Sequence, residues 1–364
     1  MPDIQKVVFL CGGRSAEHEV SLQSAQNIVR SLDFDKYSAV VIYIDREGRW
    51  FYVNDTLGFI QSENIVQWIT SQNLSPVALL GNGTDFQLMT LDDHQSIDSV
   101  AVLFPVLHGP YGEDGSVQGL AQLANLPCVG ANVLGSAISM DKDIMKRLLQ
   151  NTNLKNARSL TLYKKDLPFD SNNIESDLGW PIYVKPANMG SSVGVSRANN
   201  QQELHDAIAH AFKFDIKIIV EQEVRGREIE VAVLGNNAPQ ASEVGEIVPL
   251  TDFYSYDSKY ISGDGAELII PAALSDEQRA RLQTTAIEVF NLMECSGLAR
   301  VDMFLTASNE IYVNEINTLP GFTNISMYPK LWEASGKSQK QLISELIDFA
   351  VERETEKESL SIVR

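Results

Sequence analysis

The chain has 364 residues, and its 48 aspartates and glutamates outnumber its 29 lysines and arginines, which gives a formal net charge of −19. A chain this acidic is a poor candidate for binding nucleic acid or an anionic membrane through its overall charge. No apolar stretch approaches the roughly 20 residues needed to span a bilayer. The three cysteines lie far apart without a CxxC spacing, which argues against a disulfide framework or a thiolate zinc site and is typical of a reducing compartment. We therefore expect a cytoplasmic protein without nucleic-acid or membrane partners.

The first 130 residues show the pattern of a parallel sheet with covering helices. A β-rich run, two glycines, a run of helical periodicity and a second β-rich run follow one another, which predicts a βαβ unit. Residues 45–95 mix short apolar pieces with glycine, asparagine and aspartate and are harder to assign. The predicted elements are strands at 6–11, 39–44 and 100–107 and helices at about 20–32 and 116–124.

Two further units of mixed strands and helices follow a boundary near residue 130. The first of them is predicted to contain a helix at 140–150, strands at 180–185 and 216–222, and a helix between them at 201–212. The second is predicted to contain a strand at 228–234, a tyrosine- and glycine-bearing loop at 251–266, a helix at 275–294, a hairpin at 299–317 and a helix at 338–352.

The strongest cluster of candidate functional residues lies on the predicted hairpin. Because side chains alternate between the two faces of a strand, Arg300 and Asp302 share one face. Glu315 and Asn317 likewise share one face of the partner strand. A two- or four-residue turn centred on residues 308–309 would place Asp302 opposite Glu315 and would bring the other two residues together.

This polar patch is a candidate metal site, because carboxylate and amide oxygens are the ligands that Mg²⁺ takes in proteins, together with phosphates of a substrate. The alternative is an arginine–carboxylate network on a solvated face. The reverse face of the hairpin is predicted to pack on a core through Val301, Met303, Leu305, Tyr312 and Ile316.

Three other segments suit a ligand site, each with a simpler alternative. Lys185 ends a buried strand and precedes residues 190–194, whose backbone N–H groups could bind an anion, although the loop could also be an ordinary hairpin. Glu17 and His108 follow strands of the first sheet, at the edge where α/β sheets bind ligands. Equally well, Glu17 could be an acidic residue at the start of a helix, and His108 a loop histidine whose hydrogen bonds are made within the protein. Residues 251–266 suit a mobile lid, or else an exposed loop with packed tyrosines.

Taken in this order, the motifs resemble those of the D-alanine–D-alanine ligases of the ATP-grasp superfamily. The matching segments span residues 6 to about 330 and read GGRSAEHEVSL, LHGPYGEDGSVQG, SMDKDIMK, VKPANMGSSVGVS, FYSYDSKY, ARVDMF and NEINTLPGFTNISMYP. The resemblance implies an α/β (α+β) three-domain ATP-grasp fold. Its parts would be an N-terminal parallel-sheet substrate domain at 1–130, a central ATP-grasp subdomain at 131–221, and a C-terminal metal-binding domain at 222–364 that carries a lid at 251–266.

The implied reaction joins two D-alanines into D-alanyl-D-alanine for peptidoglycan precursor synthesis. The γ-phosphoryl group of ATP moves to the carboxylate of one D-alanine, and the amine of the second D-alanine attacks the resulting acyl phosphate, so that ADP and phosphate are released. The resemblance also implies two Mg²⁺ or Mn²⁺ ions and a homodimer.

Residue roles follow from the same motifs. The implied ATP-binding residues are Lys142, Lys185, Ser192, Glu221, Gln222, Val224, Glu228 and Lys259. The implied metal ligands are Asp302, Glu315 and Asn317. The residues implied to bind D-alanine or to act in catalysis are Glu17, His108, Ser191, Tyr260, Arg300, Gly321 and Ser326. Among these, Glu17 would accept the ammonium of the first D-alanine, and Arg300 with the N–H of Gly321 would stabilise the tetrahedral oxyanion.

Two positions bear on specificity. The adenine segment of this family often reads Glu-Lys, whereas here Gln222 follows Glu221, which keeps a hydrogen-bond donor but loses a cation. Tyr260 lies in a lid segment that D-lactate-using relatives replace, so its presence favours D-alanine as the second substrate. A ligase for D-lactate or D-serine and a non-catalytic nucleotide-binding regulator are the alternatives.

Overall fold

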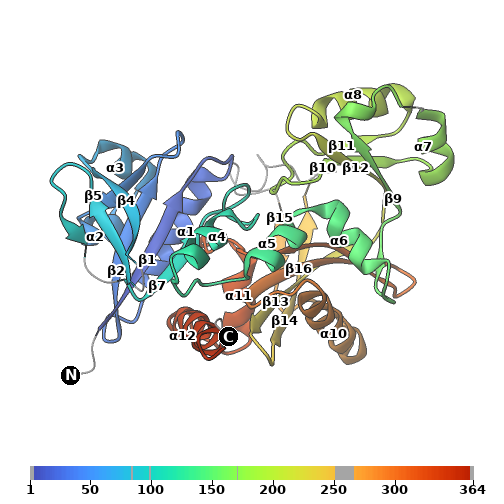
Figure 1. The fold of residues 1–364 in the computed structure, drawn as a ribbon. Helices are drawn as coiled ribbons and strands as arrows, with labels where there is room; N and C mark the ends of the chain where they lie inside the picture. The colour runs from blue at the N-terminus through green and yellow to red at the C-terminus, as the bar shows by residue number, and fades with distance from the viewer. Residues whose placement is uncertain (1–3, 83–84, 98–99, 170, 251–265, 361–364) are drawn as a thin grey trace.

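The computed structural model describes residues 4–82, 85–97, 100–169, 171–250 and 266–360, which form three β-sheets with helices packed around them (Figure 1). The elements of the first unit are β1 (Gln5–Gly12), α1 (His18–Arg30), β2 (Tyr37–Ile44), β3 (Trp50–Val53), α2 (Thr56–Gln61), α3 (Ile65–Ser71), β4 (Ser75–Asn82), β5 (Asp85–Thr90), β6 (Ser96–Ile97), β7 (Val102–Val106) and α4 (Ser116–Leu123). Strand β1 pairs in parallel with both β2 and β7, as the predicted βαβ unit requires. Strands β3 to β6 extend this sheet with antiparallel pairings, which gives residues 45–95 their place in the fold.

A smaller, antiparallel sheet of four strands forms the second unit, with strand order β11-β10-β12-β9. Its elements are β9 (Ser159–Tyr163), the short 3₁₀ helix η1 (Lys164–Asp166), α7 (Ser171–Leu178), β10 (Ile182–Pro186), β11 (Ser196–Ala198), α8 (Gln201–Ala211) and β12 (Lys217–Gln222). Val184 and Val220 pair with each other and pack with Leu204 of α8 into one core. Because strand residues alternate, Lys185 and Glu221 lie on the opposite face of this sheet.

The third sheet has six strands in the order β15-β14-β13-β16-β17-β8. The elements of this unit are α5 (Val133–Met140), α6 (Lys142–Leu149), β8 (Lys155–Asn156), β13 (Arg227–Gly235), β14 (Gln240–Pro249), β15 (Ala266–Ile269), α10 (Asp276–Leu292), β16 (Gly297–Leu305), β17 (Ile311–Asn317), α11 (Met327–Ala334) and α12 (Gln339–Glu358). Met145 of α6 and Phe290 of α10 belong to the core of this sheet. Residues 142–149, which we assigned to the central subdomain, therefore pack with the third sheet.

The first and third sheets share a hydrophobic core. Phe9 of β1, Tyr328 of α11 and Leu346 of α12 are all buried members of one cluster, so the C-terminal helices join the N-terminal sheet to the rest of the chain. All three cysteines are buried and free. In the part of the chain that the structure describes, no helix is both long and apolar enough to cross a membrane.

The hairpin of β16 and β17 has the pairing that we predicted at its functional end, but not at its turn. Asp302 lies opposite Glu315, and Arg300 lies opposite Asn317. Closer to the turn, Met303 faces Val313, so one residue of β17 is skipped in a β-bulge. The buried residues of the reverse face are Val301, Met303, Leu305, Val313 and Ile316. The prediction that Tyr312 belongs to this core is wrong, because the bulge shifts the alternation of faces and leaves Tyr312 half-buried.

Candidate active site

A cavity of about 570 Å³ lies between the four-stranded and the six-stranded sheet. Its walls come from β10, β12 and their loops on one side and from β16 and β17 on the other. The predicted ATP- and metal-binding residues that line this cavity are Lys142, Lys185, Ser192, Glu221, Gln222, Val224, Glu228, Asp302 and Glu315. The predicted Lys259 and Tyr260 lie outside the described residues.

The hairpin carries a hydrogen-bonded polar group, of which Asp302 and Glu315 line this cavity. The guanidinium of Arg300 donates two hydrogen bonds to Asp302, each of 2.7 Å, and its Nε lies 2.9 Å from a carboxylate oxygen of Glu230. The side-chain amide of Asn317 donates to the same Asp302 at 3.0 Å. The ammonium of Lys142, at the start of α6, forms an ion pair with Glu315 at 3.3 Å. Two cations thus lie among three carboxylates here, a local distribution of charge that the net charge of the chain does not reveal.

The donor chemistry of this group suits Mg²⁺. In the described residues no cluster of three or more His, Cys, Asp or Glu side chains forms a metal site. Asp302, Glu315 and Asn317 instead offer two carboxylates and one amide. Such an incomplete oxygen set is typical of Mg²⁺ sites whose remaining ligands are phosphate oxygens and water. The residues therefore fit an ion that arrives together with a nucleotide.

On the wall formed by β10 and β12, the buried carboxylate of Glu221 lies between two lysines. Glu221 forms ion pairs with Lys185 and with Lys146, the latter at 2.9 Å. Burial alone would raise the pKa of Glu221, but the two neighbouring ammonium groups outweigh it and lower this pKa to about 2. Burial opposes the charge on Lys185, and Glu221 overcomes it, so that the pKa of Lys185 is raised. Both groups are therefore charged at neutral pH, and Lys185 can present a cation to the cavity.

The loop after β10 reaches the first unit. The hydroxyl of Ser191 donates a hydrogen bond to Glu17, which precedes α1. Ser191 and Ser192 have φ angles of 50° and 61°, so two successive residues adopt the left-handed conformation. A Cβ atom on Gly190 would lie 3.0 Å from a carboxylate oxygen of Glu17, so the backbone of this loop packs closely against that side chain. Glu17 and the loop after β10 are thus neighbours in space, although they are far apart in the sequence.

His108 contacts the segment that leads to Gly321. Its Nδ1 lies 2.9 Å from the carbonyl oxygen of Leu319, and its Nε2 lies 3.2 Å from the hydroxyl of Ser24. The same hydroxyl accepts a hydrogen bond from the N–H of Phe322 at 3.1 Å. Because burial lowers the pKa of His108, the imidazole is neutral at pH 7. The first unit therefore holds the 319–322 segment on both sides of Gly321.

A second buried acid supports the same segment. Glu113 accepts hydrogen bonds from the N–H of Gly109 at 2.8 Å and from the N–H of Leu319 at 3.2 Å. Burial, with Glu17 as a lesser cause, raises the pKa of Glu113 to about 8. Residue 323, which follows the 319–322 segment, donates its backbone N–H to the hydroxyl of Ser326 at 2.9 Å. Ser326 therefore lies next to the end of this segment.

Comparison with known proteins decides the family. Residues 6–131 match the family described as the D-Ala–D-Ala ligase N-terminus, and residues 148–348 match the D-Ala–D-Ala ligase C-terminus. A D-alanine–D-alanine ligase of Shouchella clausii is 50% identical over 353 residues, which are 96% of this chain and 95% of that protein. The chain belongs to the D-alanine–D-alanine ligase family. The resemblance predicted from the motifs is therefore confirmed.

Two solved structures of ligases have the same fold as this chain. The ligase of Coxiella burnetii superimposes with a TM-score of 0.87 at 39% identity, over 98% of this chain and 96% of that one. A D-Ala:D-Ser ligase of Enterococcus faecalis superimposes with a TM-score of 0.85 at 35% identity, over 96% of this chain and 100% of that one. The predicted ATP-grasp fold class is confirmed. The second likeness shows that the fold alone does not identify the second substrate.

Two residues that line or support the ligase cavity were missing from the sequence prediction. Lys146 is in the quoted motif SMDKDIMK, one helical turn after Lys142, but only the structure shows that it is buried against Glu221. Asn314 is the skipped residue of the bulge, and its side-chain oxygen accepts a hydrogen bond from Lys185 at 3.3 Å. The position of Lys146 among apolar residues of its helix could have indicated that this lysine is buried. Regular strand alternation, in contrast, would place Asn314 on the face away from the cavity, so the sequence did not indicate its contact with Lys185.

Proposed function

We propose that this chain joins two D-alanines to D-alanyl-D-alanine and converts ATP to ADP and phosphate. One observation carries the proposal. Asp302 and Glu315 of the hairpin line a single cavity together with Lys142 and Lys185. Arg300 and Asn317 are hydrogen-bonded to Asp302 behind this wall. Phosphoryl transfer to a carboxylate requires this combination, because cations must neutralise the phosphates while acidic and amide oxygens hold metal ions. Family membership supports the same reaction.

The nucleotide is proposed to lie in the cavity with its phosphates towards the two lysines. Lys142 and Lys185 would contact phosphate oxygens, and the loop that carries Ser192 would cover them. The cavity wall formed by Glu221, Gln222 and Val224 would contact the adenine, with Glu228 on the ribose. Two Mg²⁺ or Mn²⁺ ions held by Asp302, Glu315 and Asn317 would, when bound, supply positive charge to the phosphates. Lys259 would add a further phosphate contact.

The two amino acids are proposed to bind where the first unit meets the hairpin. Glu17 would accept the ammonium of the first D-alanine, whose carboxylate takes the γ-phosphoryl group from ATP. The amine of the second D-alanine then attacks the acyl-phosphate carbonyl, loses a proton and displaces phosphate. Arg300 and the N–H of Gly321 would stabilise the oxyanion.

The remaining predicted residues would support this step. Ser326 would bind the second carboxylate, and His108 would lie beside the first substrate. Ser191 and Tyr260 would connect the lid to Glu17.

The decisive test is an ADP-release assay with D-alanine, run with and without Mg²⁺. We expect ADP, phosphate and dipeptide only when ATP, D-alanine and Mg²⁺ are all present. Glu315→Ala should abolish turnover, whereas Glu310→Ala, on the turn of the same hairpin and paired with Lys155, should leave it unchanged. Nucleotide binding without ADP release in the wild type would instead favour a regulator, and full activity of Glu315→Ala would refute the metal assignment.

A ligase for D-serine as second substrate is the competing function, because the solved structure of the Enterococcus faecalis D-Ala:D-Ser ligase is so similar. Phosphate release at neutral pH with D-alanine plus each of D-alanine, D-serine and D-lactate separates these activities. We expect D-alanine to be the preferred second substrate. A higher kcat/KM for D-serine or D-lactate would overturn this assignment.

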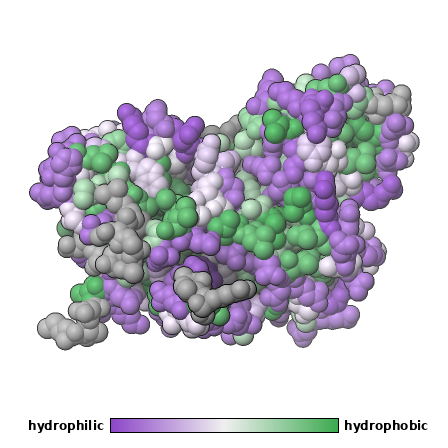
Figure 2. Space-filling view, viewed as in Figure 1, coloured by the Kyte–Doolittle hydropathy of each residue, from purple (hydrophilic) through white to green (hydrophobic). Residues whose placement is uncertain are grey.

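We also propose that the protein is a cytoplasmic homodimer that makes a peptidoglycan precursor. Helices α4 and α5 expose large apolar side chains, with Leu123 88% and Leu134 56% accessible. Figure 2 shows apolar surface near the middle of this face, where Figure 1 places these helices. Leu123→Asp should convert a dimer to a monomer in light scattering, whereas Leu57→Asp on α2 should not. A wild-type monomer would refute the dimer.

A further inference from the structure

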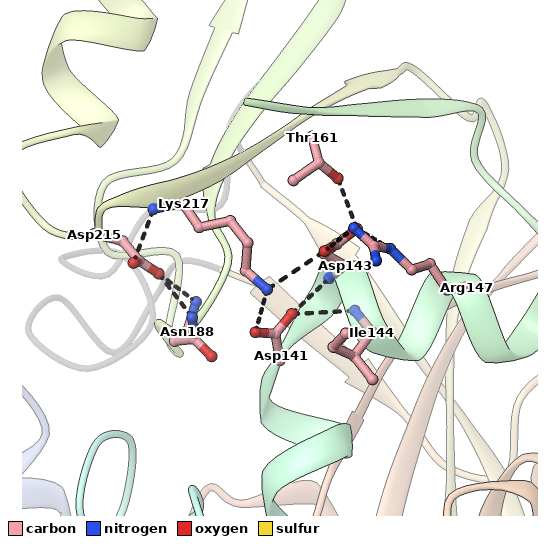
Figure 3. Close-up of polar contacts among 8 residues, drawn as sticks. All are labelled: Asp141, Asp143, Ile144, Arg147, Thr161, Asn188, Asp215 and Lys217. Atoms are coloured by element: carbon pink, nitrogen blue, oxygen red, sulfur yellow. Dashed lines mark hydrogen bonds and ion pairs between the residues drawn. The ribbon is translucent and has the colours of Figure 1, made fainter. Parts of the chain in front are cut away.

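A partly buried polar cluster lies beside the proposed phosphate site, outside the residues that would touch ATP (Figure 3). At its centre is Lys217, the first residue of β12. Its ammonium lies 2.5 Å from an oxygen of Asp141 and 3.4 Å from an oxygen of Asp143. Only 13% of the Lys217 side chain is accessible, so these ion pairs are shielded from solvent.

Asp141 determines where α6 begins. It is the N-cap of this helix, and its side chain accepts from the N–H groups of Asp143 and Ile144 at 3.1 Å each. The first residue of the helix is Lys142, which is proposed to bind phosphate. Any movement of the cap therefore moves Lys142.

Lys142 is also joined to the segment that leads into the loop at 190–194. Its backbone N–H donates to the carbonyl of Ala187 at 3.0 Å, and its ammonium donates to the carbonyl of Met189 at 2.9 Å. The position of the lysine and the position of the loop thus depend on one another.

The backbone of Lys217 holds this same segment from the other side. Its carbonyl accepts from the N–H of Ala187 at 3.0 Å. Its N–H donates at 3.1 Å to Asp215, whose other oxygen accepts two hydrogen bonds from Asn188, at 2.8 and 3.0 Å. Figure 3 shows the side chain of Lys217 extending from this backbone to the two aspartates. One residue therefore connects the start of the loop with the start of α6.

Asp143 is the second carboxylate beside the ammonium of Lys217, and its charge must be neutralised together with that of Asp141. Asp143 is also bonded to Arg147 at 2.8 Å and to the hydroxyl of Thr161 at 2.7 Å, so it is held in place next to Asp141. Without Lys217 two shielded carboxylates would face each other with a single cation beside them, and they would repel. The cluster also crosses between units, because β12 belongs to the four-stranded sheet while α6 packs in the core of the six-stranded sheet.

We propose that Lys217 is a positioning residue, which aligns Lys142 with the loop at 190–194 for binding of ATP phosphates. The inference rests on the proposed function of Lys142. It assigns to Lys217 and Asp141 a role in nucleotide affinity, although neither lines the cavity.

The test compares Lys217→Met with the wild type and with Lys155→Met, a control that removes a half-exposed ion pair elsewhere in the chain. We expect the KM for ATP and the dissociation constant of ADP to rise about tenfold in Lys217→Met, with the KM for D-alanine changed less than about twofold. Lys217→Arg, which can still reach both aspartates, should restore most of the affinity. Lys155→Met should behave as the wild type does.

Asp141→Asn provides an answer even if Lys217→Met does not fold. Asparagine is as good an N-cap as aspartate, so the helix start is preserved while the charge facing Lys217 is lost. Weaker ADP binding with an unchanged Tm would support positioning, whereas wild-type ADP binding by this folded variant would overturn it. A wild-type protein that binds no ADP at all would refute the proposed function itself, which separates the two failures.

Discussion

Asp302 lies directly opposite Glu315 across the β16–β17 hairpin, even though the two strands are out of step by one residue near their turn. The strands are joined by residues 306–310, and the N–H of Thr306 donates to the carbonyl of Glu310 at 2.9 Å. Such a five-residue loop would by itself pair Asp302 with Asn314. The bulge at Asn314 adds the residue that restores the pairing of the two carboxylates.

The bulge also gives Asn314 a function that can be tested. Its amide oxygen lies 3.3 Å from the ammonium of Lys185, which has Glu221 as its other close partner. We expect Asn314→Leu to raise the KM for ATP by about fivefold, because the lysine loses one hydrogen bond that orients it. The Tm should change little, since Asn314 lies at the cavity rather than in the core. Steady-state kinetics would check this, and an unaltered KM for ATP would show that Glu221 alone orients Lys185.

The sequence was sufficient where one physical signal dominated. The strands of the βαβ unit were predicted because their apolar runs are buried on both faces, and β1, β2 and β7 lie within a few residues of the predicted ranges. The pairing of Asp302 with Glu315 was predicted correctly, although the prediction assumed a loop of two or four residues and no bulge. The actual loop has five residues, and the bulge offsets this difference before Asp302 is reached.

The rest required contacts between distant parts of the chain. Helix α6 follows the N-terminal unit in the sequence, yet Met145 packs in the core of the third sheet, which no local pattern encodes. The ion pair of Lys146 with Glu221 joins residues 75 positions apart, and its burial depends on how two sheets meet. Strand β3, within residues 45–95, has weak alternation because three of its four side chains are half-buried. Motif resemblance could supply roles for residues, but not these supporting contacts.

Glu221 should be the residue whose neutralisation destabilises the protein most within the cavity wall. In Glu221→Gln the buried ammonium groups of Lys146 and Lys185 lose their shared counter-charge, which costs about 3–5 kcal/mol of unfolding free energy. Glu310→Gln, in an exposed pair with Lys155, is the matched control and should change stability little. Urea unfolding at pH 7 would compare them. Similar midpoints for the two variants would contradict the importance of the buried pair.

The same carboxylate sets a pH dependence. The folded-state pKa of Glu221 is lowered from 4.5 to about 2, so its ionised form is favoured by folding. Its stabilisation is complete above the unfolded pKa near 4.5 and is lost as the pH falls from there towards 2. Glu221→Gln should therefore show a shallower loss of unfolding free energy over this acid range than the wild type does.

Glu113 should act in the opposite direction. Its pKa is raised from 4.5 to about 8, so the folded state keeps a proton that the unfolded chain has lost. The unfolding free energy contributed by this group therefore decreases as the pH rises from about 4.5 to 8. Urea unfolding at pH 5, 6.5 and 8 should give a flatter profile for Glu113→Gln than for the wild type. Parallel profiles would mean that Glu113 is ionised in the folded protein throughout this range.

Gly190 should affect the first substrate as well as the nucleotide, because it lies close to Glu17 and also lines the nucleotide cavity. An alanine Cβ at this position would lie 3.0 Å from the carboxylate of Glu17, which must then shift by a few tenths of an ångström while it accepts the hydrogen bond from Ser191. We expect Gly190→Ala to raise the KM for D-alanine about tenfold, since a small displacement of an ion-pairing group is costly at a substrate ammonium. The control is Gly119→Ala in α4, where the nearest atom to a new Cβ is 4.0 Å away, and it should keep wild-type kinetics. If Gly190→Ala raised only the KM for ATP, the loop would contact phosphate without positioning Glu17, and the proposed connection between the loop and the first D-alanine would fail.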